Sequence, residues 1–216
     1  MRKETYTCSP EEFLKNADGL RFSFHAYSEF PKKPYQFAEG ETVLEHCQKV
    51  HREIERFAGA ECISDCITVH WGEASPACIQ ALRGMGYRSF MGYFKFHKDG
   101  MPLVSYNATN EMINHMGKRD FWFSEEENVL YGRIDHVLNT RTAEENLELV
   151  KKIAAHPGKG GFVSLMIHEQ YFYEGYKKYL PDFAERVLGP CRYLAEQGYK
   201  GTQVGGVTEE IWQKNG

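Results

Sequence analysis

Five side chains of types that bind metals or transfer protons follow short apolar segments of this sequence. They are His25, Glu29, His70, His168 and Glu169. Neutral imidazole and carboxylate oxygen bind divalent transition metals, and a histidine beside such a metal can serve as a general acid or base. A partly buried histidine bonded to a backbone carbonyl is the ordinary alternative for any one of them, but several at one edge of a fold indicate a site.

Aromatic residues stand next to two of these histidines. Trp71 follows His70, and Tyr171 and Tyr173 follow His168. Because the C–H faces of sugars stack on aromatic rings, this combination is typical of a sugar-binding cleft. A loop packed on its own aromatic side chains explains the same residues equally well, so both interpretations stay open.

Other polar residues are weaker candidates. Asp135 is expected at the end of a strand, where it is either a metal ligand or the ion-pair partner of Arg133. His46 and His51 fall off the apolar stripe of their helix and are expected to face solvent.

The elements that must position these residues can be read from hydrophobic periodicity, which alternates between apolar strands and amphipathic helices. Strands are expected at 20–27, 62–70, 88–94, 130–137, 161–168 and near 200–204, and helices at 41–58, 76–85, 143–155 and 182–197. This alternation is typical of an α/β protein with a parallel sheet, and both an open doubly wound sheet and a (β/α) barrel fit it. In either architecture the carboxyl ends of the strands form one edge, so His25, His70 and His168 are expected to converge there.

Local signals refine this outline. Residues 95–131 contain two turn-like stretches and predict a hairpin-rich insertion. Ser75 followed by Pro76 marks a helix start, and Thr142 with Glu145 predicts a capping box.

Composition limits the classes of function. The chain has 216 residues, 42% hydrophobic and 26% charged, with a net charge of −4, so a single domain over 1–216 is the simplest expectation. The slightly acidic balance gives no electrostatic reason to bind nucleic acid, and no apolar run has the length of a membrane helix. Six cysteines without a C-x-x-C pair are expected to be free thiols, which indicates a cytoplasmic protein.

Two stretches in the first half resemble motifs of the polysaccharide deacetylases of carbohydrate esterase family four, also called the NodB homology domain. The sequence LRFSFHAYSEFP, residues 20–31, is similar to a motif whose two histidines bind the metal; His25 matches the first, and Glu29 stands in place of the second. The sequence ITVHWGEASPACIQALRGMGYRSFMGYF, residues 67–94, is similar to the next motif, although Thr68 replaces its arginine.

A third stretch, Phe162 to Tyr199 with LMIHE and EQGYK, resembles the last motif of that family. There His168 matches the histidine that protonates the leaving group. The family's first motif, an aspartate-rich strand that supplies the catalytic base, is not found before residue 20, so the domain is expected to be shortened at its N-terminus or completed by a second copy in a homodimer.

The resemblance implies a distorted (β/α) barrel that removes acetyl groups from a glycan with a divalent metal, Zn²⁺ first and Ni²⁺, Co²⁺ or Mn²⁺ as alternatives. The resemblance gives His25 and Glu29 as metal ligands and His168 as the catalytic acid. The strand-end argument, and not the family, adds His70 as a further metal ligand and Glu169 as a catalytic residue beside His168. The aromatic residues Trp71, Tyr171 and Tyr173 are expected to contact the substrate, a carbohydrate or other small molecule. Two other functions remain open: a glycan-binding protein on the same fold without catalysis, and a different metal-dependent hydrolase of an amide or phosphoester in which Asp135 takes part.

Overall fold

The computed structural model describes residues 10–28, 32–103 and 105–215, with side chains through Ile211. The predicted metal ligand Glu29 therefore lies outside the described residues, as does Cys8. The helices are α1 (Pro10–Lys15), α2 (Gly40–Ala58), α3 (Pro76–Gly84), α4 (Asn110–Met116), α5 (Ala143–Ala154), α6 (Phe183–Glu196) and α7 (Val204–Asn215). The strands are β1 (Cys66–Ile67), β2 (Ser89–Gly92), β3 (Lys95–Phe96), β4 (Pro102–Leu103), β5 (Phe121–Ser124), β6 (Val129–Arg133), β7 (His136–Val137) and β8 (Leu165–Met166).

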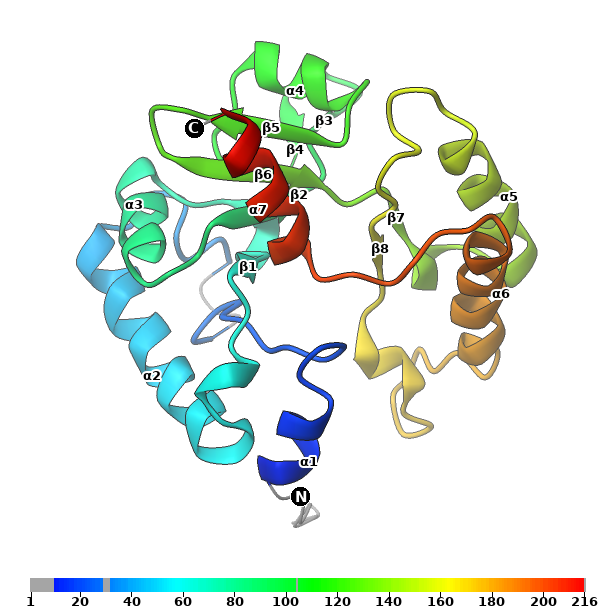
Figure 1. Ribbon diagram of the computed structural model, residues 1–216, viewed down its shortest axis with the longest axis horizontal. Helices are drawn as coiled ribbons and strands as arrows, with labels where there is room; N and C mark the ends of the chain where they lie inside the picture. Colours follow the sequence, from blue (N-terminus) through cyan, green and yellow to red (C-terminus); the bar gives the residue numbers. More distant parts are fainter. Residues whose placement is uncertain (1–9, 29–31, 104, 216) are drawn as a thin grey trace.

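A mixed sheet in the order β1-β2-β6-β5 forms the centre of the molecule, with β1, β2 and β6 parallel and β5 antiparallel at the edge. Helices α2 and α3 lie side by side next to this sheet, and α7 packs against β2 (Figure 1). The predicted α/β class is therefore confirmed.

The parallel strands follow one another in chain order. Phe22 pairs with Ile63 in an isolated parallel bridge, which places the segment 20–25 beside the segment leading into β1. At the other side, β7 and β8 form a separate parallel pair, with α5 and α6 beyond them (Figure 1). One continuous stretch connects both sheets, because the Ile134 N–H donates to Gly92 O and the Asp135 N–H donates to Ser164 O.

These strands make an open arc. No closed barrel is formed by the part of the chain that the structure describes, so the expected barrel is not confirmed. The prediction of a strand near 200–204 is wrong, since these residues lead into α7. The expected strand 62–70 is regular only at β1; it is preceded by the 3-10 turn Ala60–Cys62 and followed by another, His70–Gly72.

The helix boundaries follow from their caps. The Ser75 hydroxyl accepts the Cys78 N–H at the start of α3, and Thr142 and Glu145 form the expected capping box at the start of α5. Each cap satisfies backbone donors that have no partner within the helix. The predicted insertion contains the β3–β4 hairpin and the β5–β6 hairpin, together with α4, which the sequence analysis did not anticipate.

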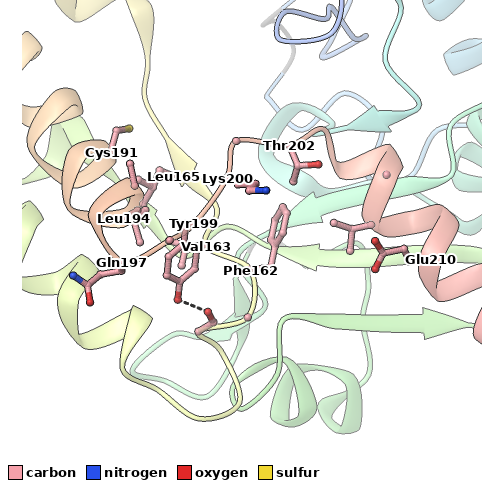
Figure 2. Close-up of a pocket in the computed structure, with 17 residues that line it drawn as sticks. Phe162, Val163, Leu165, Cys191, Leu194, Gln197, Tyr199, Lys200, Thr202 and Glu210 are labelled. Carbon is pink, nitrogen blue, oxygen red and sulfur yellow. Dashed lines mark hydrogen bonds between the residues drawn. The ribbon is translucent and has the colours of Figure 1, made fainter.

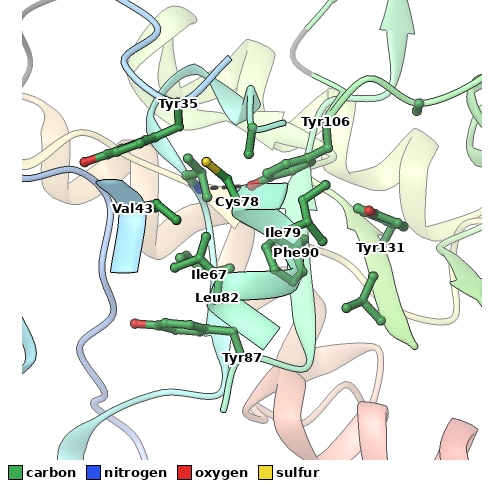
Figure 3. Close-up of a cluster of buried hydrophobic side chains, with 14 of the residues drawn as sticks. Tyr35, Val43, Ile67, Cys78, Ile79, Leu82, Tyr87, Phe90, Tyr106 and Tyr131 are labelled. Atoms are coloured by element: carbon green, nitrogen blue, oxygen red, sulfur yellow. Dashed lines mark hydrogen bonds between the residues drawn. The ribbon is translucent and has the colours of Figure 1, made fainter. Parts of the chain in front are cut away.

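The main core lies between the central sheet and the pair α2 and α3, and it is rich in tyrosine (Figure 3). The Tyr106 hydroxyl accepts the Val69 N–H and donates to Met91 O, which satisfies a phenol that is 3% exposed. The Tyr87 hydroxyl accepts the Phe24 N–H and lies 2.8 Å from His51 Nε2. His51 is 8% exposed, so the expectation that it faces solvent is wrong.

Candidate functional site

His25 and His70 are in direct contact at the ends of two neighbouring segments. The His70 N–H donates to His25 O, which keeps the two chain segments parallel up to these residues. Their rings meet edge to face at 5.0 Å between centroids, and His25 Nε2 lies 3.0 Å from His70 Nδ1. Two of the three predicted metal ligands thus meet, as the strand-end argument required.

The backbone fixes the tautomer of His25. Its Nδ1 lies 2.5 Å from Thr68 O, and a carbonyl oxygen can only accept, so Nδ1 carries a proton and, when the ring is neutral, Nε2 carries the lone pair. A carbonyl bonded to the second ring nitrogen is the usual support of a metal-binding histidine. His25 is thereby oriented to present Nε2 toward His70.

The separation of the two nitrogens is that of a hydrogen bond, in which His70 Nδ1 donates to the lone pair of His25 Nε2 over 3.0 Å. Two nitrogens bound to one tetrahedral Zn²⁺ at about 2.0–2.1 Å from the metal are roughly 3.3 Å apart. A shared metal ion would therefore have to replace the proton between the two rings and move them slightly apart. Among the described residues, which do not include Glu29, no group of three metal-binding side chains occurs.

Trp71 extends this pair with an exposed indole ring. The ring centroid lies 6.0 Å from that of His70, and the Lys32 ammonium lies over the ring at 4.8 Å from its centroid. The indole is 43% exposed, so a flat ligand has access to it. The predicted substrate-binding residue Trp71 is thus placed beside the histidine pair.

Strained backbone marks the loops on this edge. Lys33, Trp71, Phe94, Tyr106 and Asn107 have φ between 48° and 62°, a region that residues other than glycine seldom adopt. Such strain persists where surrounding contacts enforce it, often near functional sites. Here the Asn107 amide donates to Ala74 O and the Tyr106 N–H donates to Gly72 O, which anchors the turn that carries Trp71.

His168 lies beyond β8, where Asn139 orients it. Both the backbone N–H and Nδ1 of His168 lie within hydrogen-bond distance of Asn139 Oδ1, at 3.1 and 2.9 Å. Because an amide oxygen only accepts, Nδ1 carries the proton and Nε2 carries a lone pair when the ring is neutral. A histidine whose ring is held by a polar neighbour can act in general acid or base catalysis from its other nitrogen.

The loop after His168 is partly packed on itself. The Tyr171 ring lies 6.4 Å from His168 and 5.4 Å from Tyr176, in both cases edge to face. Tyr173 is 60% exposed, and Glu169 is exposed in the first turn of the 3-10 helix Glu169–Phe172. Tyr173 is therefore the more accessible of the two predicted tyrosines.

The predicted residues fall into two groups. One contains His25, His70 and Trp71, and the other contains His168 with its loop; the ring contacts and hydrogen bonds described above lie within each group. They lie at the carboxyl ends of different strands of the same arc. The expected convergence therefore holds for His25 and His70, which follow neighbouring segments, and not for His168, which follows a strand farther along the arc.

Asp135 has an ion-pair role. Its Oδ1 accepts from the Arg133 guanidinium, and its Oδ2 accepts the Ser164 N–H at 2.9 Å. Burial raises the pKa of this carboxyl, while the Ser164 N–H and the Arg133 charge lower it. Both oxygens are engaged, so the structure favours the ion pair over the metal-ligand alternative.

A separate cavity of about 830 Å³ lies between the strand leading into β8, α6 and the start of α7 (Figure 2). Phe162, Val163, Leu165 and Leu194 supply apolar walls, and Lys200 and Glu210 supply charge. None of the described site residues predicted from the sequence lines it. This cavity is therefore not the site that the histidines define.

Sequence reasoning missed the residues that orient the histidines. Asn139 is the clearest case, and its signal was available, since it follows β7 at the same edge. No helix among the described residues combines the length and apolar character needed to cross a membrane. Comparisons of the chain with protein-family models, curated proteins and solved structures gave no match.

Proposed function

We propose that this protein is a metal-dependent hydrolase that removes acetyl groups from a glycan. The observation that carries the proposal is the His25–His70 pair, in which two ring nitrogens lie 3.0 Å apart and Thr68 O fixes the tautomer of one ring. A bound divalent metal, Zn²⁺ in the first place, polarises an acyl carbonyl and lowers the pKa of water.

The residues of the chain have distinct roles in this proposal. His25 and His70 hold the metal, together with Glu29 as predicted from the sequence. The protonated form of His168 would give its Nε2 proton to the leaving group, with Asn139 holding Nδ1. Trp71 and Tyr173 offer exposed rings to the sugar.

The proposal includes a fold of the polysaccharide deacetylase type. The order of the parallel strands supports it, because each strand lies beside the next one in the chain. A (β/α) barrel has this order, whereas a doubly wound sheet reverses direction near its middle. A homodimer and a cytoplasmic location stay predictions from the sequence.

Metal content is the first test. Protein purified without chelator or affinity metal is dialysed against Zn²⁺ and then against buffer, and bound metal is measured by mass spectrometry. We expect about one metal ion per chain, and its loss in His25→Ala and His70→Ala. The matched control is His97→Ala, which removes an exposed histidine from the β3–β4 hairpin and should keep the metal.

Acetate release from acetylated oligosaccharides tests the reaction. We expect His168→Ala to lower kcat by about 10²–10⁴-fold with unchanged metal content and melting temperature. Asn139→Ala should lower kcat less, because it removes only the partner of the ring. Wild-type protein that takes up no metal would reject the hydrolase, and oligosaccharide binding by such protein would favour the glycan-binding alternative.

A further inference from the structure

A second cavity, of about 480 Å³, lies between β7 and α5, next to the β3–β4 hairpin. Its volume falls within the range of about 300–1,000 Å³ that small-molecule sites occupy. It contains none of the described residues of the His25–His70 pair or of the His168 loop. The cavity is lined by Tyr93, Lys95, Leu103, Asp135, His136, Val137, Thr140, Arg141, Leu149 and Ile153.

One side of this cavity is apolar. Leu149 and Ile153 lie four residues apart on α5 and therefore on the same face of the helix. Both are half-buried, and Leu103 from β4 and Val137 from β7 add to the apolar surface. These side chains can pack against a hydrocarbon body.

The charged lining has an excess of positive charge. Lys95 and Arg141 both line the cavity, and the one acidic lining residue, Asp135, is already paired with Arg133. The Lys95 ammonium also lies over the Tyr93 ring, 5.8 Å from its centroid. Arg141 is itself 3.8 Å from Glu145 Oε1, but that pair is more than half exposed, so its charge is only weakly compensated. An anionic group entering the cavity therefore meets the Lys95 ammonium, the exposed Arg141 guanidinium and a carboxylate that is already paired with Arg133.

The surroundings of Lys95 agree with this charge balance. Burial lowers the pKa of Lys95, and the positive charges of Arg133 and Lys159 lower it further, against an opposing effect of Asp135. Burial is the largest of these effects, and a bound anion would oppose all the effects that lower the pKa by favouring the charged form of Lys95.

His136 lines this cavity and is fixed in orientation. Its Nε2 lies 2.6 Å from Asn146 Oδ1, while the Asn146 amide nitrogen donates to Leu138 O. The amide oxygen must therefore face the imidazole, so Nε2 carries the proton. His136 is held in place by the buried Asn146 and keeps the wall of the cavity rigid.

We propose that this cavity binds a small organic carboxylate, with the anionic group near Lys95 and Arg141 and the hydrocarbon body against α5. The occupant is a molecule with one charged end and an apolar chain or ring. The site is independent of the proposed metal site, since no described residue is shared between them.

Hexanoate is the probe for calorimetric titration of the full chain, beside acetate and butyrate. We expect saturable binding of hexanoate with a Kd of about 1 mM or tighter, and a tightening of about fourfold for each added methylene. Hexylamine has the same chain with the opposite charge and should bind at least about tenfold more weakly.

Two variants and a control locate the binding. Lys95→Gln and Arg141→Gln should each weaken hexanoate binding by about tenfold, whereas Lys98→Gln, in the exposed hairpin turn outside the cavity, should not. His25→Ala should also leave binding intact, which separates this proposal from the metal site. Absence of saturable hexanoate binding, equal binding of hexylamine, or binding of inorganic phosphate as tight as that of hexanoate would each overturn the proposal.

Discussion

Arg133 and Asp135 form a buried ion pair within one stretch of chain, with the Arg133 Nε donating to Asp135 Oδ1 at 2.8 Å. Their side chains are 6% and 3% exposed. Arg133 also donates to the backbone oxygens of Met116 and Arg119, and Asp135 accepts from Ser164. The pair therefore joins β6 to the end of α4 and to the strand that leads into β8.

Replacing Asp135 with alanine should destabilise the fold strongly, because it leaves the Arg133 charge buried without its closest partner. We expect a loss of about 3–5 kcal/mol in the free energy of unfolding, measured by urea denaturation. The control is Asp182→Ala, which removes the more exposed pair with Arg186 and should change stability by less than about 1 kcal/mol. Similar losses in both variants would contradict a special role for the buried pair.

His51 should make stability depend on pH. Burial lowers the pKa of His51 below its ordinary value of 6.5, against a small opposing effect of Glu55. The unfolded chain therefore takes up a proton at a higher pH than the folded chain. Stability from this residue is present above pH 6.5 and falls as the pH drops from 6.5 toward the lower pKa of the folded state.

The measurement is the urea midpoint between pH 7.5 and pH 5, in the wild type and in His51→Gln. Glutamine keeps a hydrogen-bonding group for the Tyr87 hydroxyl but does not titrate, so the fall over this range should become shallower. His97→Gln removes an exposed histidine and should retain the wild-type slope. An unchanged slope in His51→Gln would assign the pH dependence to other groups.

Trp71 is expected to contribute through its indole ring, whereas its backbone conformation would suit glycine better. At φ 62° the residue is strained, so Trp71→Gly should be more stable than Trp71→Ala by about 1 kcal/mol in urea denaturation. Both variants lack the indole under Lys32 and should bind acetylated oligosaccharide more weakly than the wild type. Equal stability of the two variants would mean that the backbone at this position is not strained.

Gly160 should tolerate no side chain. A Cβ atom there would lie 2.3 Å from Ala154 O and 3.0 Å from His156 O, and neither backbone oxygen can move easily. We expect Gly160→Ala to lower the free energy of unfolding by about 1–3 kcal/mol. At Gly175 nothing lies within 4 Å of the added atom, so Gly175→Ala should leave the thermal midpoint unchanged or raise it slightly.

The sequence predicted the elements whose signals are local. The cap at Ser75, the capping box at Thr142 and the apolar stripe of α2 are short patterns that neighbouring residues determine almost completely. The prediction of a strand at 200–204 is wrong because these residues, KGTQV, include one apolar side chain, Val204, which is too few to show a period. His51 was missed because its burial depends on Tyr87, which lies 36 residues away in sequence.

In the candidate site, too, the features that neighbouring elements determine could be predicted, and those that depend on contacts made in the fold could not. The contact of His25 with His70 was predictable, because the ends of neighbouring parallel strands meet at one edge. The orientations of the His25 and His168 rings were not predictable, because they depend on Thr68 O and on Asn139 respectively, and neither residue belongs to a recognisable motif. The role of Asp135 was likewise decided by Ser164, a partner brought close only by the fold.

The stretch that contains Ile134 and Asp135 belongs to both sheets, with consecutive peptide N–H groups donating to opposite neighbours. The His25–His70 pair lies on one side of this stretch, and Asn139 with His168 lies on the other. Two adjacent peptide units therefore join the sheet beside the His25–His70 pair to the strand pair that leads to His168. The relative position of these two groups of side chains is thus set by backbone hydrogen bonds and not by any contact between the side chains themselves.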